Sequence, residues 1–159
     1  MTVRAAMPSD LGAALPLWTA LHREHEGQDP RYRLADDAAQ RWATDFRTWT
    51  RSAADRVWLA LDGGVPVGLL TAHLYEPTPM FRPYGLVYVD DLYVAPAARG
   101  RGAATRLLDA ARQWGAAEGA TEIRAGVLAQ NEAGRRFWAR QGAVDFSVTV
   151  TLRLDVPPR

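Results

Sequence analysis

The chain has 159 residues, a formal net charge of +1 and a hydrophobic fraction of 48%, which is the composition of one ordinary globular domain. This charge balance, without a run of five or more basic residues, argues against binding to nucleic acid. Because cysteine is absent, disulfides, thiolate nucleophiles and cysteine-ligated zinc are excluded. No apolar stretch reaches the ~20 residues of a membrane span. We therefore expect a single-domain cytoplasmic protein over residues 1–159 that binds neither nucleic acid nor a membrane.

The N-terminal third predicts two helices. Leu11, Leu15 and Trp18 recur at helical spacing, and this first helix is expected to end near Gly27. A second amphipathic stretch predicts a helix over residues 36–52.

A β-hairpin is predicted next. The apolar run 57–61 is followed by Asp62-Gly63-Gly64, and glycine readily adopts the positive φ angles of tight hairpin turns. We expect a return strand over 67–75, then a proline-rich loop, and a further strand over 86–94.

The C-terminal half has the order strand, helix, strand, helix, strand that is typical of parallel or mixed α/β sheets. One helix is expected to begin at Gly102, followed by a strand over 122–128. Asn131 is placed to cap the next helix and Gly142 to end it. Residues 144–154 alternate between apolar and polar, which predicts a closing strand.

The segment from Val94 to Thr105 is the most informative, because it places a strand, a turn, the glycines Gly100 and Gly102, and a helix in succession. Glycines at a helix start let backbone N–H groups converge on an anion, and the helix dipole adds about half a positive charge. The segment therefore predicts a binding loop for a pyrophosphate.

Two common phosphate-binding motifs do not fit this loop. A Walker P-loop requires lysine, and the chain contains none. A Rossmann fingerprint requires a third glycine, where this chain has Thr105, and an acidic residue at the end of the next strand, where it has Ala129-Gln130.

A third motif does fit. Residues 99–104 match the Q/R-x-x-G-x-G/A motif of the GCN5-related N-acetyltransferases, and the chain resembles this family closely over residues 86–146. Residues 89–96 are similar to the family's fourth strand, and residues 131–138 to its N-x-x-A-x-x-F-Y segment.

The resemblance implies an α/β (α+β) acyl-CoA N-acyltransferase fold, with a mixed, mostly antiparallel sheet of six or seven strands flanked by about four helices. It divides the domain into an acceptor-side half (1–85), an acetyl-CoA-binding core (86–146), and a closing strand and tail (147–159). Acetyl-CoA is the implied cosubstrate. The backbone of Leu92 and Val94 is expected to pair with its pantetheine arm. The full set of residues expected to bind acetyl-CoA comprises Leu92, Tyr93, Val94, Arg99, Gly100, Arg101, Gly102, Ala103, Ala104, Thr105, Asn131 and Trp138.

The acceptor amine must lose a proton before it attacks a thioester. Asp90 and Asp91 lie where related enzymes carry an acid on the fourth strand. They point to opposite faces unless a bulge intervenes. We favour Asp90, acting through water. The alternative is that both carboxylates are solvated or cap a neighbouring loop.

The family often uses a tyrosine to protonate the departing CoA thiolate, and here Trp138 stands in its place. An indole N–H is no useful acid. Either Tyr93, Tyr84 or Tyr88 replaces it, or the thiolate leaves unassisted.

Two clusters have both a functional and a structural interpretation. His22, His25 and Glu26 have helical spacing for part of a metal site, but we favour a polar helix end and predict no metal. Four tryptophans are expected to pack in the core rather than to bind an organic cation: Trp18, Trp42, Trp49 and Trp58.

The sequence thus predicts an acetyl-CoA-dependent N-acetyltransferase that acts on a primary amine by direct transfer in a ternary complex. The alternatives are a non-catalytic acyl-CoA-binding regulatory module and a nucleotide-binding protein. The acceptor is expected to be a small-molecule or peptide amine, selected by loops 27–34 and 76–84. A homodimer through the C-terminal strand is a further expectation. Acidic residues in and near these loops hint at a cationic acceptor: Glu24, Glu26, Asp29 and Glu76.

Overall fold

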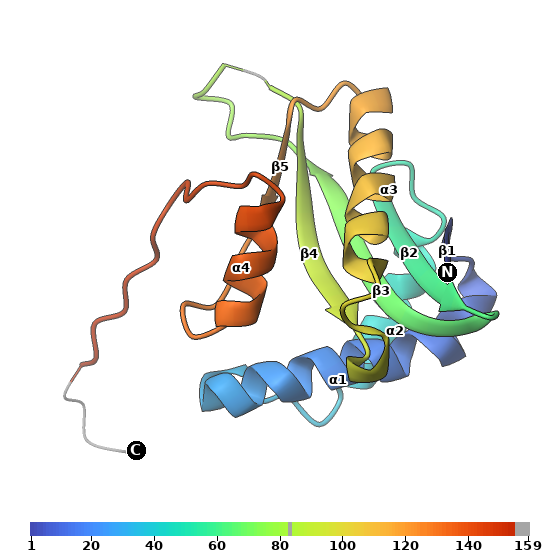
Figure 1. Cartoon of the computed structure of the whole chain (residues 1–159). Coiled ribbons are helices and arrows are strands. Elements are labelled where there is room, and N and C mark those ends of the chain that lie inside the picture. Colours follow the sequence, from blue (N-terminus) through green and yellow to red (C-terminus); the bar gives the residue numbers. More distant parts are fainter. Residues whose placement is uncertain (83, 155–159) are drawn as a thin grey trace. The chain divides into compact units, whose positions relative to one another are not determined.

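A computed structural model describes residues 1–82 and 84–154, and the chain forms two compact units, Met1–Gly126 and Val127–Arg159. The first unit contains the sheet and three of the helices drawn in Figure 1, and the second contains the remaining helix. Within the described residues, no helix combines the length and the apolar character needed to cross a membrane.

Five strands of the first unit form one sheet in the order β1-β2-β3-β4-β5. All neighbours are antiparallel except β4 and β5, which are parallel. This confirms the predicted mixed, mostly antiparallel sheet, with five strands among the described residues instead of six or seven. The strands are β1 (Thr2–Ala5), β2 (Asp55–Asp62), β3 (Val65–Tyr75), β4 (Leu86–Val94) and β5 (Glu122–Ala125).

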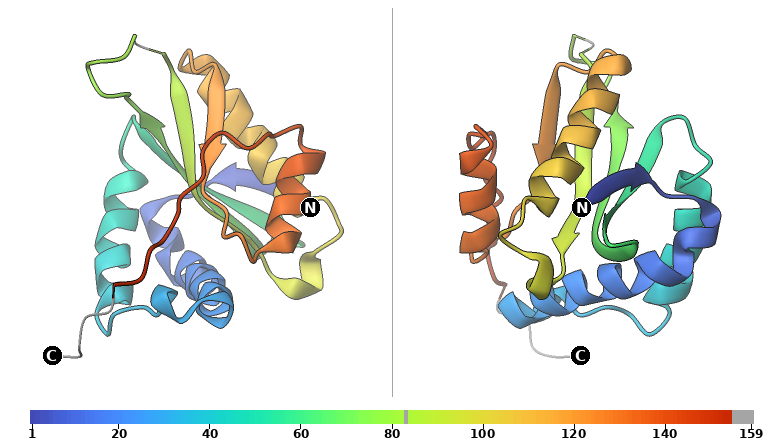
Figure 2. Two further views of the ribbon diagram at one scale, coloured as in Figure 1. Left: turned by 90° about the vertical axis from the view of Figure 1, so that its left-hand side faces the viewer. Right: turned by 45° about the vertical axis from the view of Figure 1, so that its right-hand side comes forward.

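Helices cover both faces of this sheet (Figure 2). On one face lie α1 (Leu11–Gln28) and α2 (Ala38–Trp49), and on the other lies α3 (Ala103–Ala117). Three short 3-10 helices complete the unit: η1 (Pro8–Asp10), η2 (Pro30–Tyr32) and η3 (Pro96–Ala98).

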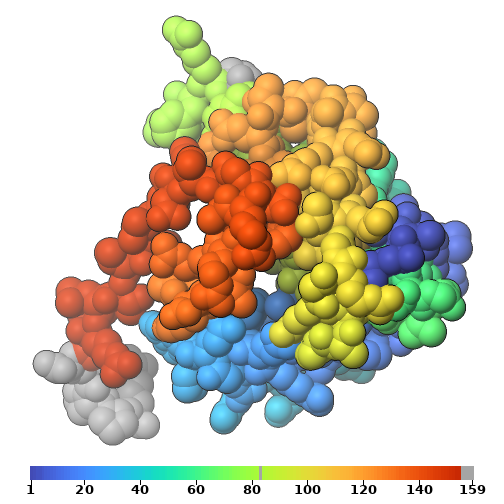
Figure 3. Space-filling view, in the orientation of Figure 1, coloured from blue at the N-terminus to red at the C-terminus, as the bar shows by residue number. Residues whose placement is uncertain are grey.

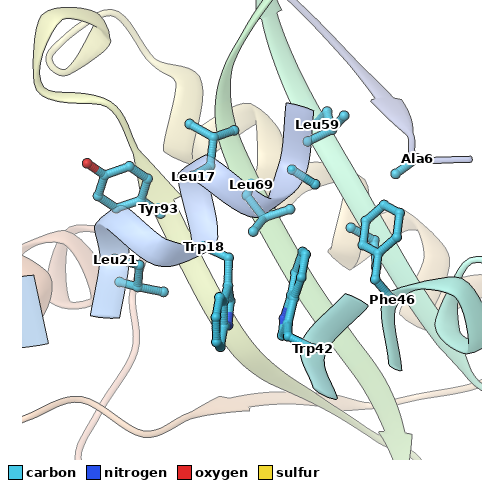
Figure 4. Close-up of a cluster of buried hydrophobic side chains, with 11 residues drawn as sticks. Ala6, Leu17, Trp18, Leu21, Trp42, Phe46, Leu59, Leu69 and Tyr93 are labelled. Atoms are coloured by element: carbon cyan, nitrogen blue, oxygen red, sulfur yellow. The ribbon is translucent and has the colours of Figure 1, made fainter. Parts of the chain in front are cut away.

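The core under α1 and α2 is aromatic (Figure 4). Trp18 stacks on Trp42 with ring centroids 5.1 Å apart, and Phe46 packs against Trp42. These rings meet Leu59 and Leu69 of the sheet, both fully buried, and each such side chain contributes about 1.5–3 kcal/mol. The predicted role of the tryptophans in core packing is confirmed.

The core under α3 uses the opposite side chains of the same strands. Trp58 precedes Leu59 on β2 and therefore faces the other way, where its ring meets Trp114 of α3 edge to face at 5.7 Å. A Cβ at Gly115 would come within 2.8 Å of Val87 Cγ2. Glycine at this position thus lets α3 approach β4 closely.

The turn between β2 and β3 has the predicted glycines. Gly63 and Gly64 have φ angles of 58° and 85°, the left-handed region that glycine adopts without a steric penalty.

The second unit contains α4 (Glu132–Arg140). The Asn131 side chain accepts a hydrogen bond from the Gly134 amide at 2.8 Å, and Gly142 follows the helix end with φ 84°. Both predicted boundaries are confirmed.

The predicted closing strand is wrong for residues 144–154, where the structure has no strand. Its six apolar side chains are exposed, from Phe146 at 71% to Val144 at 87%. Alternation makes a segment suitable for a sheet, but a strand also requires a neighbour that accepts and donates its backbone hydrogen bonds. The remaining tail, 155–159, lies outside the described residues.

Candidate functional site

The glycine turn connects η3 to α3 as the sequence predicts. Gly100 and Gly102 have φ angles of 75° and 81°, and α3 begins directly after Gly102. The first bond of the helix joins the Arg106 amide to the Gly102 carbonyl at 3.0 Å. The amides that precede Arg106 in the first turn, such as those of Ala103 and Ala104, therefore have no acceptor within the helix.

The surface beside this turn is open. A Cβ built on Gly100 or on Gly102 would meet no atom within 4 Å, and the turn lies at the surface beside α1 in Figure 3. The positive end of the α3 dipole thus lies beside this open surface. The residues present fit a diphosphate, because they offer hydrogen-bond donors at a place where an anion meets no side chain.

Two arginines fix the turn to the rest of the unit. Arg99 donates from Nε to the Val94 carbonyl at 2.9 Å and pairs with Glu24 of α1 at 2.6 Å. Arg101 pairs with Asp62 at the end of β2 at 2.5 Å. Both guanidinium groups therefore position the backbone of the turn, and their charges are already balanced by carboxylates.

The pairing of β4 changes halfway along the strand. Its parallel ladder with β5 ends where Val89 pairs with Ala125, whereas its antiparallel ladder with β3 continues to Val94. From Asp90 to Val94, β4 thus extends beyond its pairing with β5. Leu92 lies in this stretch and pairs with Leu70 on the β3 side. This is the arrangement expected where a substrate arm adds to the strand edge.

A β-bulge places both acidic residues of β4 on one face. Asp91 pairs with Thr71 and Val89 with Ala72, so that Asp90 is an extra residue in the β4 register. Thr71 donates to Asp91 at 3.0 Å, and the His73 ring bonds Asp90 at 2.8 Å. Thr71 and His73 are two residues apart on β3 and share a face. Both carboxylates therefore lie on the α1 and α2 side, which resolves the open question of their orientation.

Asp91 is the buried member of this pair. Its side chain is only 11% exposed, and Nε2 of His22 lies 3.7 Å from Oδ1. Burial raises the pKa of Asp91 to about 6, although the bond from Thr71 acts in the opposite direction. Burial likewise lowers the pKa of His22 to about 4, because a desolvated imidazole resists protonation.

Asp90 is more accessible, with 43% of its side chain exposed. Burial raises the pKa of Asp90, and its hydrogen bond with His73 partly offsets this effect. No local sequence pattern indicates a role for His73, because only the register of β3 against the bulged β4 brings this residue beside Asp90. A histidine in an otherwise apolar strand was the sole signal available.

The Tyr93 ring is buried near the C-terminal end of β4. Its hydroxyl donates to Glu24 at 3.4 Å, and the Arg99 guanidinium lies 5.6 Å from the ring centroid. Burial, followed by the nearby Glu24 carboxylate, raises the pKa of Tyr93. Of the other tyrosines considered, Tyr84 stacks with Arg124 and Tyr88 lies beside His73.

Asn131 and Trp138 belong to the second unit. The Asn131 oxygen is engaged by the Gly134 amide, and the Trp138 ring contacts Phe137 at 5.6 Å. Their contacts with acetyl-CoA stay predictions.

The histidines of α1 take part in ring contacts. His22 packs against Trp18 at 4.5 Å and His25 against Tyr32 at 5.9 Å, while Glu26 pairs with Arg33. Among the described residues, no three side chains of the metal-binding types gather as a possible metal site.

The chain is similar to known proteins of one family. The model of the acetyltransferase (GNAT) family matches residues 17–143. No curated protein sequence shows significant similarity to the chain.

Several solved structures are similar in fold. A mutant of the BH1408 protein from Bacillus halodurans has a TM-score of 0.86 at 21% identity, with 97% of this chain and 99% of that chain covered. The aminoglycoside N-acetyltransferase AAC(6')-Iy in complex with CoA has a TM-score of 0.77 at 19% identity, with 98% and 95% covered. The apo aminoglycoside 6'-N-acetyltransferase AAC(6')-IG from Acinetobacter haemolyticus has a TM-score of 0.76 at 18% identity, with 99% and 100% covered.

Proposed function

Since the chain belongs to the GNAT family of acetyltransferases, whose cosubstrate is acetyl-CoA, we propose that it transfers an acetyl group from acetyl-CoA to a primary amine. The observation that carries this proposal is the open glycine turn at the start of α3. Bound acetyl-CoA supplies the acetyl thioester. The chain supplies the binding, the orientation and the removal of a proton.

Residues Arg99 to Thr105 hold the diphosphate in this proposal, mainly through backbone amides. The pantetheine arm lies along β4 beyond the end of its pairing with β5, next to the backbone of Leu92 and Val94. The Val94 carbonyl already accepts a hydrogen bond from Arg99, so that its second lone pair is left for the arm. Asn131 and Trp138 complete the set proposed from the family motif.

Asp90 is the carboxylate that serves the acceptor amine. Of the two acidic residues on β4, it has the more exposed side chain, whereas Asp91 is buried against Thr71 and His22. A base must come within hydrogen-bonding distance of the proton it removes. The chain has no cysteine, and direct attack within a ternary complex needs no covalent acetyl-enzyme. For Tyr93, the bond to Glu24 supports a role in positioning α1 against β4.

The acceptor is a small-molecule or peptide amine in this proposal, and an aminoglycoside is one candidate because two of the similar structures are aminoglycoside acetyltransferases. The acidic residues in and near the acceptor loops add little evidence about which amine is the acceptor. Glu24 pairs with Arg99, Glu26 with Arg33 and Asp29 with Arg31. These carboxylates are therefore less available to a cationic acceptor than the sequence alone suggests.

Thiol release tests the proposal. Purified protein is mixed with acetyl-CoA and, separately, with polyamines, aminoglycosides, amino acids and a lysine peptide. Release of free CoA that depends on one of these amines, with initial-rate lines that intersect when both substrates vary, supports direct transfer. Tight binding of acetyl-CoA without turnover on any amine would instead identify a non-catalytic acyl-CoA-binding module.

We also propose a homodimer formed through residues 144–154. This segment alternates strictly and exposes six apolar side chains, while β5 lies at the edge of its sheet. An exposed alternating segment and an edge strand can pair between copies of one chain.

A further inference from the structure

His73 and Asp90 form a hydrogen-bonded pair on the face of the sheet where Asp91 and Thr71 also lie. Nδ1 of His73 is 2.8 Å from Oδ2 of Asp90. The contact depends on the bulge, because Tyr88, not Asp90, is the register partner of His73 on β4. The extra residue brings the Asp90 carboxylate within reach of the ring.

The surroundings of the imidazole are acidic and aromatic. On the β2 side its register partner is Asp55. On the β4 side are Asp90 and Tyr88, whose ring centroid lies 5.6 Å away, and Tyr75 follows on β3 at 6.4 Å. Carboxylates and aromatic faces both attract an alkylammonium group. These neighbours therefore favour the approach of a protonated amine to His73.

The bond to Asp90 selects one tautomer of the ring. An ionised carboxylate only accepts hydrogen bonds, so that Nδ1 must carry the hydrogen and Nε2 the lone pair. Among the described residues, Nε2 of His73 has no recorded partner. The structure thus leaves Nε2 as a proton acceptor on a side chain that is about one-third exposed.

His22, the other histidine that lies beside a carboxylate, is less suited to accept a proton from a substrate. His22 lies next to Asp91, but its side chain is only 20% exposed and its ring packs on Trp18. Burial lowers the pKa of His22 to about 4, which makes its imidazole a poor base near neutral pH.

We propose that His73 is the general base of the acetyl transfer, and that Asp90 is the positioning residue that holds its ring and tautomer. The proposal rests on the proposed function and replaces the water expected between Asp90 and the amine. Nε2 takes one proton from the acceptor ammonium. The amine nitrogen then forms the N–C bond to the acetyl carbon, the C–S bond breaks, and the second proton from nitrogen goes to the departing thiolate. His73 returns its proton to solvent.

Nuclear magnetic resonance tests the tautomer without any acceptor amine. The chain has three histidines, so that a two-bond ¹H–¹⁵N correlation of the holo protein with CoA resolves each ring, and His73→Asn assigns the signals. The expected result is a hydrogen on Nδ1 of His73 that is lost as the dominant form in Asp90→Asn. A dominant Nε2–H tautomer in the unaltered protein would overturn the proposal.

Kinetics tests the role of the base. In His73→Asn, the side-chain amide can still donate to Asp90, but no group takes the proton. We expect kcat to fall by about 10²–10⁴-fold, with unchanged calorimetric binding of acetyl-CoA and with loss of the acidic limb of the pH profile of kcat/KM. In Asp90→Asn, we expect a smaller fall in kcat and a retained acidic limb. His25→Asn is the matched control, with unchanged kcat.

The outcomes separate the two proposals. If the unaltered protein releases CoA with an amine and His73→Asn does so equally well, the assignment of His73 is wrong and the acetyltransferase stands. If no amine is turned over by the unaltered protein, both proposals fall together.

Discussion

Nε2 of His22 lies 3.7 Å from Oδ1 of Asp91, and burial acts against the charge of both groups. It raises the pKa of Asp91 to about 6 and lowers the pKa of His22 to about 4. Each shift couples the protonation state to the free energy of unfolding, and the two have opposite signs.

The Asp91→Asn variant should reveal this coupling. With a raised folded pKa, Asp91 holds its proton more tightly than the unfolded chain does, so that its contribution to stability is lost as pH rises from about 4 to about 6. The asparagine amide can still accept from Thr71 and carries no charge. We expect the variant to be more stable than the unaltered protein by about 3 kcal/mol near neutral pH, as measured by urea unfolding.

The His22→Gln variant is the counterpart. With a lowered folded pKa, His22 contributes stability above the unfolded value, and this is lost as pH falls from about 6.5 to about 4. Stability of Asp91→Asn should thus rise with pH across this window, and stability of His22→Gln should fall. Parallel pH curves for the two variants would contradict the burial that the structure gives these groups.

Gly85 should tolerate no side chain. A Cβ there would lie 2.7 Å from the Ala120 Cα and from the Gly119 carbonyl oxygen, which are backbone atoms that cannot swing aside. We expect Gly85→Ala to destabilise the protein by about 2 kcal/mol. Gly27→Ala is the control, because a Cβ meets nothing within 4 Å in α1 and should stabilise the helix by about 0.5–1 kcal/mol. Equal melting temperatures for Gly85→Ala and Gly27→Ala would contradict the close approach of Gly85 to the backbone of Gly119 and Ala120.

Asn131 has a structural role that can be separated from its proposed contact with CoA. Removal of the cap to the Gly134 amide in Asn131→Ala should cost about 1 kcal/mol of unfolding free energy. Asn131→Ser keeps a cap but loses the side-chain N–H donors. We therefore expect Asn131→Ser to be more stable than Asn131→Ala but to bind acetyl-CoA as weakly as Asn131→Ala does. Full affinity in Asn131→Ser, measured by calorimetry, would restrict the residue to capping.

Residues 144–154 should govern the oligomeric state. Val148 is 82% exposed and lies on the apolar side of the alternation, so that Val148→Asp places a charge in the proposed interface. Thr149→Asp places the same charge on the opposite side and serves as the control. We expect light scattering to show a dimer for the unaltered protein and for Thr149→Asp, and a monomer for Val148→Asp. A monomeric unaltered protein at micromolar concentration would refute the dimer.

The sequence predicts most elements of the first unit because local signals determine them. Gly63-Gly64 specify a hairpin turn, Gly102 the start of α3, and apolar spacing the faces of α1 and α3. The expected strand over 86–94 coincides with β4. The glycine turn before α3 was predictable for the same reason, since it requires only a glycine-containing segment before a helix.

Features that depend on pairing between distant segments were not predictable. The bulge at Asp90 is visible only in the register of β4 against β3, and without it neither the shared face of Asp90 and Asp91 nor the contact with His73 follows. The predicted strand over residues 144–154 is wrong because alternation indicates a strand but does not specify the neighbouring strand with which it would pair. The contacts of Arg99 were not predictable either. Its motif position indicates binding of acetyl-CoA, whereas in the structure its side chain bonds Glu24 and the Val94 carbonyl.

The proposed acetyl-CoA site depends most on the backbone at Gly102, where φ is 81° and a side chain would point into open space. In Gly102→Val, the Cβ and its methyl groups would occupy the place where the diphosphate approaches the amides, and the positive φ would be strained. Gly119, at the other end of α3, has φ 78° and an equally open surface. Gly119→Val therefore imposes the same kind of strain away from the turn and is the matched control.

Calorimetric titration of the two variants with acetyl-CoA is the most direct test. We expect Gly119→Val to bind acetyl-CoA as the unaltered protein does. We expect Gly102→Val to show no binding heat while remaining folded by circular dichroism. Normal binding of acetyl-CoA by folded Gly102→Val would contradict the proposed site.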